Sequence, residues 1–354
     1  MIKKYILISL FAVSALSASA QRMEVSSPSI DCGQVQYRNP VSADFEIRNK
    51  GNRPLRIDEV RVSCGCTTVD HPKTDIAADG KFSLHVTYDA LQMGSFDKLV
   101  AVYANGEKNP LVLHLKGRVV QHIVDFSGSY PFKLGSLLAD KTDLEYDDVN
   151  RGELPQQKIH IRNTTSGVVQ PVVMHLPNYL RADVSPSKIA PGHSGVVTIT
   201  LDSRLLKDLG LTQTSVYLGQ YPGDKVSHEK EISISAVLLP KFDQISASAS
   251  SAVPHLTLST TELNLGPFGT KKKLKGEVII RNDGQATLDI KSLQMFTAGL
   301  QVSLNKTKLA PGEEAKMKVT AEQRQLRNLR TKPRILMITN DPQSPKVVVH
   351  IITE

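Results

Sequence analysis

One pattern occurs three times along the chain: alternating apolar and polar residues, then an Asn, then a Gly within a short turn. The three segments are residues 45–51, 159–167 and 278–284. Their asparagines, Asn49, Asn163 and Asn282, lie 114 and 119 residues apart. This spacing is too long for a solenoid repeat and suits tandem domains of ordinary size. The repeat therefore predicts a chain built from three similar units.

A glycine turn marks the second half of each unit, about 30 residues after the asparagine. The turns contain Gly80, Gly192 and Gly312. After each glycine, strict alternation predicts a strand with one face on a core and the other in water. Short strands, frequent turn signals and little helix predict an all-β chain of three tandem immunoglobulin-like antiparallel β-sandwich domains after a signal peptide. The expected domains are residues 21–120, 121–240 and 255–354, with a Ser- and Ala-rich linker at 241–254.

The amino end has the layout of a secretory signal. Two lysines precede an apolar run at residues 5–16, which is too short to cross a bilayer, and Ala18, Ser19 and Ala20 supply the small residues of a cleavage site. We expect residues 1–20 to be removed near Ala20. The mature chain is then expected to be periplasmic, envelope-associated or secreted, without a transmembrane segment.

Basic charge is concentrated in the third unit, which has sixteen Lys and Arg residues against nine Asp and Glu. The candidate interaction residues are Lys271, Lys272, Lys273, Lys275, Arg324, Arg327 and Arg330. Such a set can bind an anionic envelope polymer or an acidic protein face, and it can equally be a solvated surface without a dedicated partner. Nucleic acid is not expected as a partner, because no aromatic residues alternate with these charges.

The three cysteines form the most specific local signal. Cys64 and Cys66 are separated only by Gly65, and Cys32 lies near the start of the first unit. If the strand before the motif continued through it, the two thiols would face one side with Cα atoms about 7 Å apart. That distance is at the limit for a disulfide, so a bridge requires the chain to bend at Gly65.

Three interpretations of the cysteines remain open at this stage. In the structural one, the thiols are small buried apolar groups, or Cys32 bridges one of the pair. In the metal one, Cys64, Cys66, Cys32 and His71 hold Cu or Zn, and the sequence otherwise indicates no cofactor. In the redox one, the Cys-Gly-Cys motif exchanges thiols and disulfides, although it lacks the helix start that lowers a thiol pKa.

The segment Ser63-Cys64-Gly65-Cys66-Thr67, with Asn49, Gly51 and Gly94, resembles a bacterial family of domains of unknown function that carry Ser-Cys-Gly-Cys-Thr. The resemblance covers about residues 24–118. That family is related to the immunoglobulin-like repeats of Hydin-type proteins and the major sperm protein. The resemblance implies an exported envelope protein with immunoglobulin-like domains. Cys32 departs from the family pattern, and this departure favours a bridge that involves Cys32.

No catalytic motif stands out in the chain. It has no His-Glu-x-x-His, no Gly-x-Ser-x-Gly, and no phosphate-binding Gly-rich loop. We therefore expect a protein that is not an enzyme. The predicted function is an exported envelope scaffold that binds a protein or an anionic envelope component through its tandem domains, and the alternative is metal binding or thiol redox chemistry at Cys-Gly-Cys.

Overall fold

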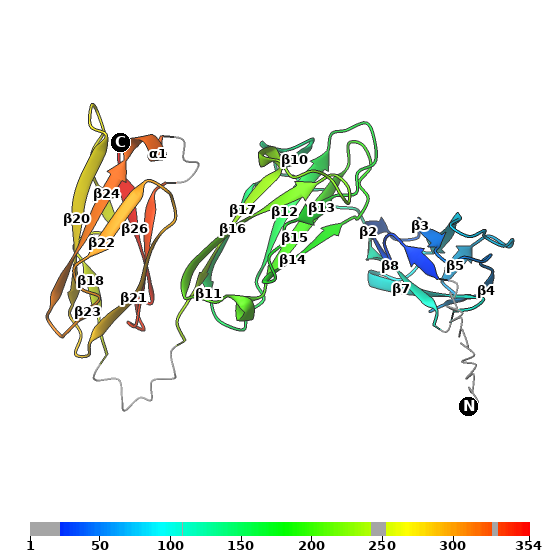
Figure 1. Cartoon of the computed structure of the whole chain (residues 1–354), viewed down its shortest axis with the longest axis horizontal. Coiled ribbons are helices and arrows are strands. Elements are labelled where there is room, and N and C mark those ends of the chain that lie inside the picture. The colour runs from blue at the N-terminus through cyan, green and yellow to red at the C-terminus, as the bar shows by residue number, and fades with distance from the viewer. Residues whose placement is uncertain (1–21, 108, 242–252, 328–331) are drawn as a thin grey trace, which may run out of the picture. The chain divides into compact units, whose positions relative to one another are not determined.

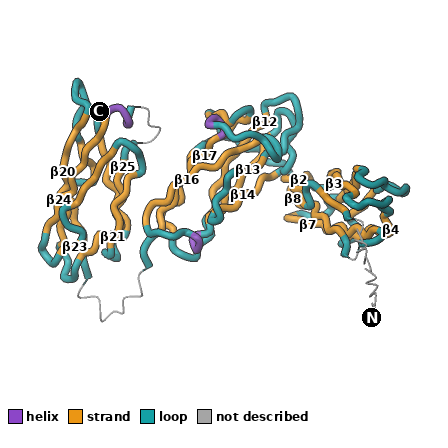
Figure 2. The backbone as a smooth tube through the Cα atoms, in the orientation of Figure 1, coloured by secondary structure: helices purple, strands orange, loops and turns teal. Residues whose placement is uncertain are grey.

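The computed structural model describes residues 22–107, 109–241, 253–327 and 332–354 (Figure 1). The predicted signal peptide and most of the predicted linker lie outside these residues. The described chain is nearly all β, and its strands form six sheets (Figure 2). The helical segments among the described residues are three short pieces, 3-10 helices at Ser203–Leu205 and His228–Lys230 and α1 at Gln323–Leu326. The predicted all-β, immunoglobulin-like fold class is confirmed.

The first sandwich packs two four-stranded sheets, β1-β3-β6-β5 and β2-β8-β7-β4, around one core. Its strands are β1 Met23–Val25, β2 Ser29–Gln36, β3 Val41–Asn49, β4 Ile57–Val62, β5 Thr67–Asp70, β6 Lys81–Tyr88, β7 Gly94–Ala104 and β8 Leu111–Val120. Alternate residues of β6 are buried, as its sequence pattern predicts, and Leu84 and Val86 are fully inaccessible. Burial of one face of each strand supplies the driving force for closing the two sheets.

The second sandwich packs the sheets β14-β15-β12-β10-β9 and β11-β17-β16-β13 around a second core. Its strands are β9 Phe132–Leu134, β10 Leu137–Ala139, β11 Asp143–Val149, β12 Gln156–Asn163, β13 Val172–Met174, β14 Leu180–Ser185, β15 Ser194–Leu201, β16 Gly210–Gly219 and β17 Glu231–Leu238. In β15 the predicted alternation is again confirmed, because Val197, Ile199 and Leu201 are fully buried.

The third sandwich packs the sheets β18-β20-β24-β22 and β19-β26-β25-β21-β23 around a third core. Its strands are β18 Leu256–Leu258, β19 Glu262–Asn264, β20 Lys273–Asn282, β21 Leu288–Met295, β22 Leu300–Leu304, β23 Lys308–Leu309, β24 Glu314–Glu322, β25 Arg334–Thr339 and β26 Lys346–Ile352. Ala315, Met317 and Val319 of β24 face the core, so the alternation after the third glycine turn is confirmed too.

The sandwiches are grouped into two compact units. One contains the first sandwich up to Asp125 together with Ser185–Lys188, and the other contains the second and third sandwiches. Within the second unit, a separate apolar cluster of Val237, Phe296, Leu336 and Ile338 lies between those two sandwiches. The side chain of Gln294 adds two hydrogen bonds, to the backbone N–H (2.7 Å) and the carbonyl (3.0 Å) of Leu211. The proposed division into three separate domains stays a prediction.

The repeated asparagines Asn49, Asn163 and Asn282 have the same role in the three sandwiches. Each ends the strand β3, β12 or β20 and is fully buried. Its Nδ2 donates to the carbonyl four residues later and to another 26 or 27 residues later, at 2.8–3.1 Å. Its Oδ1 accepts the N–H two residues later. One side chain therefore satisfies the buried backbone of the turn and holds a distant loop.

The backbone carbonyl of each asparagine also reaches the turn that follows about 30 residues later. It accepts the N–H of Asp79, Gly192 and Gly312 at 2.7–2.9 Å in the three sandwiches. These three residues have a left-handed backbone, with φ of 60°, 76° and 78°. The expected equivalence of Gly80 with the two later glycines is therefore wrong by one residue. Asp79 occupies the left-handed position in the first sandwich, since Asp tolerates that conformation better than most residues.

Candidate functional site

The Cys-Gly-Cys motif forms a turn between the two sheets of the first sandwich. Strand β4 ends at Val62 and β5 begins at Thr67, and these strands lie at the edges of different sheets. The N–H of Thr67 donates to the carbonyl of Cys64 (3.3 Å), which closes the turn. The strand does not continue through the motif, because the chain has to leave one sheet here to enter the other, and the bend that a Cys64–Cys66 bridge requires is present.

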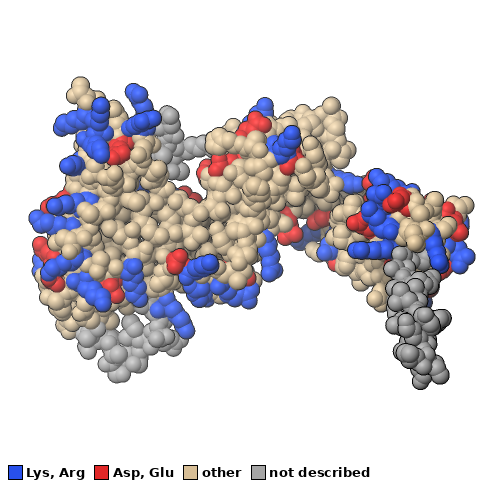
Figure 3. Space-filling model, in the orientation of Figure 1, with Lys and Arg blue, Asp and Glu red and all other residues tan. Residues whose placement is uncertain are grey.

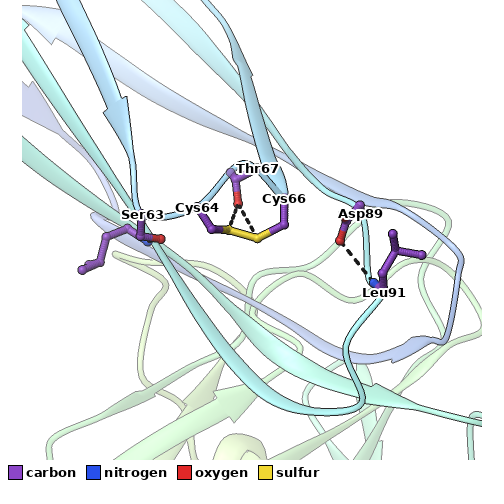
Figure 4. Close-up of a disulfide and its surroundings, with 7 residues drawn as sticks. Ser63, Cys64, Cys66, Thr67, Asp89 and Leu91 are labelled. Atoms are coloured by element: carbon purple, nitrogen blue, oxygen red, sulfur yellow. Dashed lines mark hydrogen bonds between the residues drawn. A yellow bond between two sulfur atoms is a disulfide. The ribbon is translucent and has the colours of Figure 1, made fainter.

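The bend brings the two thiols together, and Cys64 and Cys66 form a disulfide with Cα atoms 5.2 Å apart (Figure 4). This separation is ordinary for a disulfide. Both cysteines are half-buried, whereas Gly65 is exposed. The hydroxyl of Thr67 lies 3.6 Å from the Sγ atom of Cys64 and 3.9 Å from that of Cys66. Thr67 itself is buried, so its hydroxyl contacts the two sulfur atoms from the protein side of the bridge.

Cys32 is a free thiol, so the predicted bridge between Cys32 and the motif is wrong. Its half-buried side chain lies in β2 and packs against the first core. Burial, with a smaller effect from the charge of Asp31, raises the pKa of Cys32 to about 11. The thiol is therefore protonated at neutral pH and is a weak nucleophile.

The predicted metal set is not assembled. His71 places Nδ1 3.0 Å from the carbonyl of Pro72 and Nε2 3.0 Å from the Nζ of Lys73. Across residues 22–107, 109–241, 253–327 and 332–354, no group of three or more His, Cys, Asp or Glu side chains could hold a metal ion. Because Cys64 and Cys66 are joined to each other, this geometry does not favour the Cu or Zn interpretation.

The disulfide contributes little to holding the sandwich together. It closes a ring that contains only Gly65, and the loop-entropy relation gives about 1.6 kcal/mol for a three-residue loop, compared with about 3 kcal/mol for a 15-residue loop. We expect the substitution Cys64→Ser to lower the free energy of unfolding by no more than about 1.6 kcal/mol. Urea unfolding followed by far-UV circular dichroism measures this change. A loss of several kcal/mol would show instead that the bridge is a structural staple.

The basic residues predicted in the third unit converge at one end of the third sandwich. Lys273, at the start of β20, is paired in the sheet with Glu322, at the end of β24, and α1 follows directly. The carbonyl of Lys272 accepts the N–H of Gln323 (3.0 Å). This arrangement gathers residues that are about 50 positions apart in the sequence (Figure 3). We call Lys271, Lys272, Lys273, Lys275, Arg324 and Arg327 the basic end; the predicted Arg330 lies outside the described residues.

All six residues of the basic end are exposed. Within the described part of the chain, only Lys273 of this set has a carboxylate partner, Glu322. A shallow groove of about 610 Å³ continues from Lys275 across the outer face of β20, β24 and β22. Lys318 also lines this groove. The basic end is thus a concentrated positive surface in which only Lys273, among the described residues, is paired with a carboxylate.

A second cleft, of about 480 Å³, lies inside the second unit between β11, β16 and β17 on one side and residues 296–298 on the other. Arg334 is the only cation among the described residues that line it. Its guanidinium donates to both carboxylate oxygens of Glu145 and lies 4.1 Å from the ring centroid of Phe296. Because this charge is already paired, the cleft has no free cation for an anionic ligand.

Sequence reasoning did not identify Thr67, Leu91 or Met93 as site residues. Thr67 was noted only as part of a motif, although its hydroxyl contacts both sulfur atoms. Leu91 and Met93 lie in the crossover from β6 to β7, and both are more than half exposed. Two large apolar residues inside a segment that otherwise reads as a turn are the signal that could have identified this surface.

Two family models match parts of the chain. Residues 23–119 match the family described as "Protein of unknown function (DUF1573)", and residues 254–353 match the "HYDIN/CFA65/VesB-like, Ig-like domain". The resemblance predicted from residues 63–67 is thereby confirmed over the first sandwich, and the relation to Hydin-type immunoglobulin-like domains is confirmed in the third. No curated protein sequence matches the chain.

A solved structure has the same fold at low sequence identity. A crystal structure of a protein of unknown function from Porphyromonas gingivalis W83 is 18% identical, with a TM-score of 0.50, and the match covers 62% of this chain and all of that one. The ASH/PapD-like domain 7 of human CEP192 is 10% identical, with a TM-score of 0.27, covering 34% of this chain and all of that one. Among the described residues, no helix is long and apolar enough to cross a membrane.

Proposed function

We propose that this chain is an exported binding protein of the cell envelope that docks through the basic end of its third sandwich. Immunoglobulin-like sandwiches present loops and sheet edges on a rigid core, which suits them to protein interaction. The signal-peptide pattern at residues 1–20 favours export. The partner is an acidic protein face or an anionic polymer of the envelope, since both offer the complementary charge.

The convergence of the basic end is the observation that carries this proposal. Lys271 and Lys272 come from the turn before β20, whereas Arg324 and Arg327 come from α1 and the residue after it. Charges within about 8 Å reinforce one another at physiological ionic strength, because the screening length is of that order. A set with one local carboxylate partner therefore produces a positive field that reaches into solvent and attracts an anionic surface.

The triple substitution Lys271→Gln, Lys272→Gln and Arg324→Gln tests the role of the basic end. Each basic residue contributes roughly 1 kcal/mol near an anionic surface, so we expect about 100-fold weaker binding. Fluorescence titration with an anionic polysaccharide such as alginate and with polyglutamate measures the two anionic sources separately. Binding to polyglutamate alone would indicate an acidic protein partner.

A matched control removes the same charge elsewhere. Lys158, Lys291 and Lys308 are exposed and have no carboxylate partner among the described residues. Their replacement by Gln should change the affinity less than threefold, because these residues lie away from the basic end. If both triple variants weaken binding equally, the effect reports net charge alone, and the basic end is not a docking surface.

A further inference from the structure

The disulfide turn of the first sandwich is partly exposed, since Cys64 and Cys66 are half-buried. Gly65 is exposed, and no atom lies within 4 Å of the position that a Cβ atom would occupy there. The turn also stands outside the sheets, between the ends of β4 and β5. We infer that the Cys64–Cys66 disulfide is a thiol–disulfide exchange site whose substrate is a cysteine in an apolar segment of another polypeptide.

A structural role does not explain this bridge. It joins two residues of one turn and ties no separate elements of the sandwich together. The centre of the core is formed by larger side chains, of which Phe45, Leu84, Val100 and Leu113 are essentially inaccessible to solvent, while Cys66 is only partly buried against it. Opening the bridge therefore leaves the packed sheets in place. A bond that is not needed for the fold can be opened and closed as part of a function.

The Thr67 hydroxyl is positioned to support the exchange. It lies 3.6 Å from the Sγ atom of Cys64 and 3.9 Å from that of Cys66, so it is closer to Cys64. When a disulfide opens, one sulfur leaves as a thiolate, and a thiolate with a hydrogen-bond donor is a better leaving group. The geometry therefore favours attack on Cys66 and departure of Cys64.

The crossover from β6 to β7, which is hydrogen-bonded to the disulfide turn, carries exposed apolar side chains. The N–H of Asp89 donates to the carbonyl of Cys66 (3.1 Å), so the crossover from β6 to β7 is attached to the disulfide turn. The carboxylate of Asp89 accepts the N–H of Leu91 (3.1 Å), as Figure 4 shows. Leu91 is 54% exposed, Met93 55% and Val62 37%. These side chains suit an apolar polypeptide segment better than a small charged thiol.

One exchange reduces the Cys64–Cys66 bridge and oxidises the substrate dithiol in two steps. A substrate thiolate attacks Sγ of Cys66, a bond forms between these sulfurs, and the Cys64–Cys66 bond breaks with its electron pair leaving on Cys64. A second thiolate of the same substrate then attacks the substrate sulfur of this mixed disulfide and releases Cys66 as a thiolate. Two electrons have passed from the substrate dithiol to the bridge, and the substrate leaves with a disulfide of its own.

Two synthetic dithiol peptides with equal cysteine spacing, one flanked by Leu and one by Ser, test the inference on the full mature chain. Bridge opening is followed by alkylation and mass spectrometry. We expect the Leu peptide to open the bridge roughly tenfold faster, which corresponds to burial of about one large apolar side chain. The double substitution Leu91→Ser and Met93→Ser should remove this preference. Equal rates for the two peptides would overturn the assignment of the substrate.

Thr67→Val and Thr67→Ser test the chemistry with free cysteine as the attacking thiol. We expect Thr67→Val to slow opening roughly tenfold and Thr67→Ser to retain the rate, since only the hydroxyl matters. Cys32→Ser and the triple variant of the basic end should both exchange at the wild-type rate. Wild-type circular dichroism spectra establish that each variant is folded. A bridge that resists millimolar glutathione, or an unchanged rate in Thr67→Val, would overturn the exchange site.

Discussion

Replacement of Asn282 by Ala is expected to lower the free energy of unfolding by about 3–5 kcal/mol. The side chain makes four hydrogen bonds, from its Nδ2 to the carbonyls of Ala286 and Leu309 and from the N–H groups of Gly284 and His255 to its Oδ1. Each is worth about 1 kcal/mol, and the buried groups left without partners add to the loss. The chain has no Trp, so urea unfolding is followed by far-UV circular dichroism and tyrosine fluorescence.

Asn264 provides the matched control for this substitution. Its Oδ1 accepts the N–H of Gly266, two residues later, in the same local geometry, but the residue is exposed. We expect Asn264→Ala to cost less than about 1 kcal/mol, because water replaces the lost partner. Asn163→Ala should behave like Asn282→Ala, since its side chain is equally buried and bonded. Similar small losses of unfolding free energy in all three variants would contradict the view that the buried asparagine side chains hold the turn and the distant loop together.

Replacement of Lys230 by Met is expected to cost about 3–5 kcal/mol, because it leaves the carboxylate of Asp224 unpaired in a nearly buried position. The Nζ of Lys230 lies 2.9 Å from both oxygens of Asp224 and 2.9 Å from the carbonyl of Lys225. The two side chains are only 11% and 8% exposed. Thermal unfolding of the second unit measures the loss. Lys116→Met, at an exposed ion pair with Asp97, should cost less than about 1 kcal/mol.

The pH dependence of the same pair gives an independent check. The backbone N–H of Gln220, followed by the Lys230 ammonium, lowers the pKa of Asp224. A carboxyl group with a lowered pKa in the folded state stabilises the protein above its unfolded pKa of about 3.9 and loses that contribution as the pH falls through the folded value. Wild-type stability should therefore fall below pH 4, and Lys230→Met should show a smaller change there. An identical acid profile in the two proteins would contradict the assigned ion pair.

The repeated asparagine and glycine positions show which features of the fold can be predicted from local sequence and which cannot. The spacing of Asn49, Asn163 and Asn282 predicted repeated units, and each asparagine has the same buried role. The reason for their recurrence, a set of bonds to carbonyls 26 or 27 residues away, was not visible in the pattern. A partner at that distance is set by sandwich closure, which the neighbouring residues do not encode.

The cysteine motif shows the opposite outcome. The bridge to Cys32 was wrong, and the choice between a continuing strand and a bend at Gly65 was left open by the sequence. The alternation that includes Val60 and Val62 correctly predicts a strand, but it does not show that this strand ends at Val62. The chain leaves its sheet after Val62 because β5 pairs with β6 in the other sheet. The disulfide therefore depends on a crossover that no local periodicity could predict.

The sequence by itself determined the all-β class, the immunoglobulin-like repeats and the buried face of the main strands, because period-two alternation and turn residues act over a few neighbouring positions. Only the tertiary structure decided which cysteines pair, that the crossover from β6 to β7 is hydrogen-bonded to the disulfide turn, and that Lys271 and Arg324 share one end of a sandwich. Those proximities depend on sheet register, such as the pairing of Lys273 with Glu322, and on the crossovers between sheets. Register and crossovers are settled by the packing of the whole core.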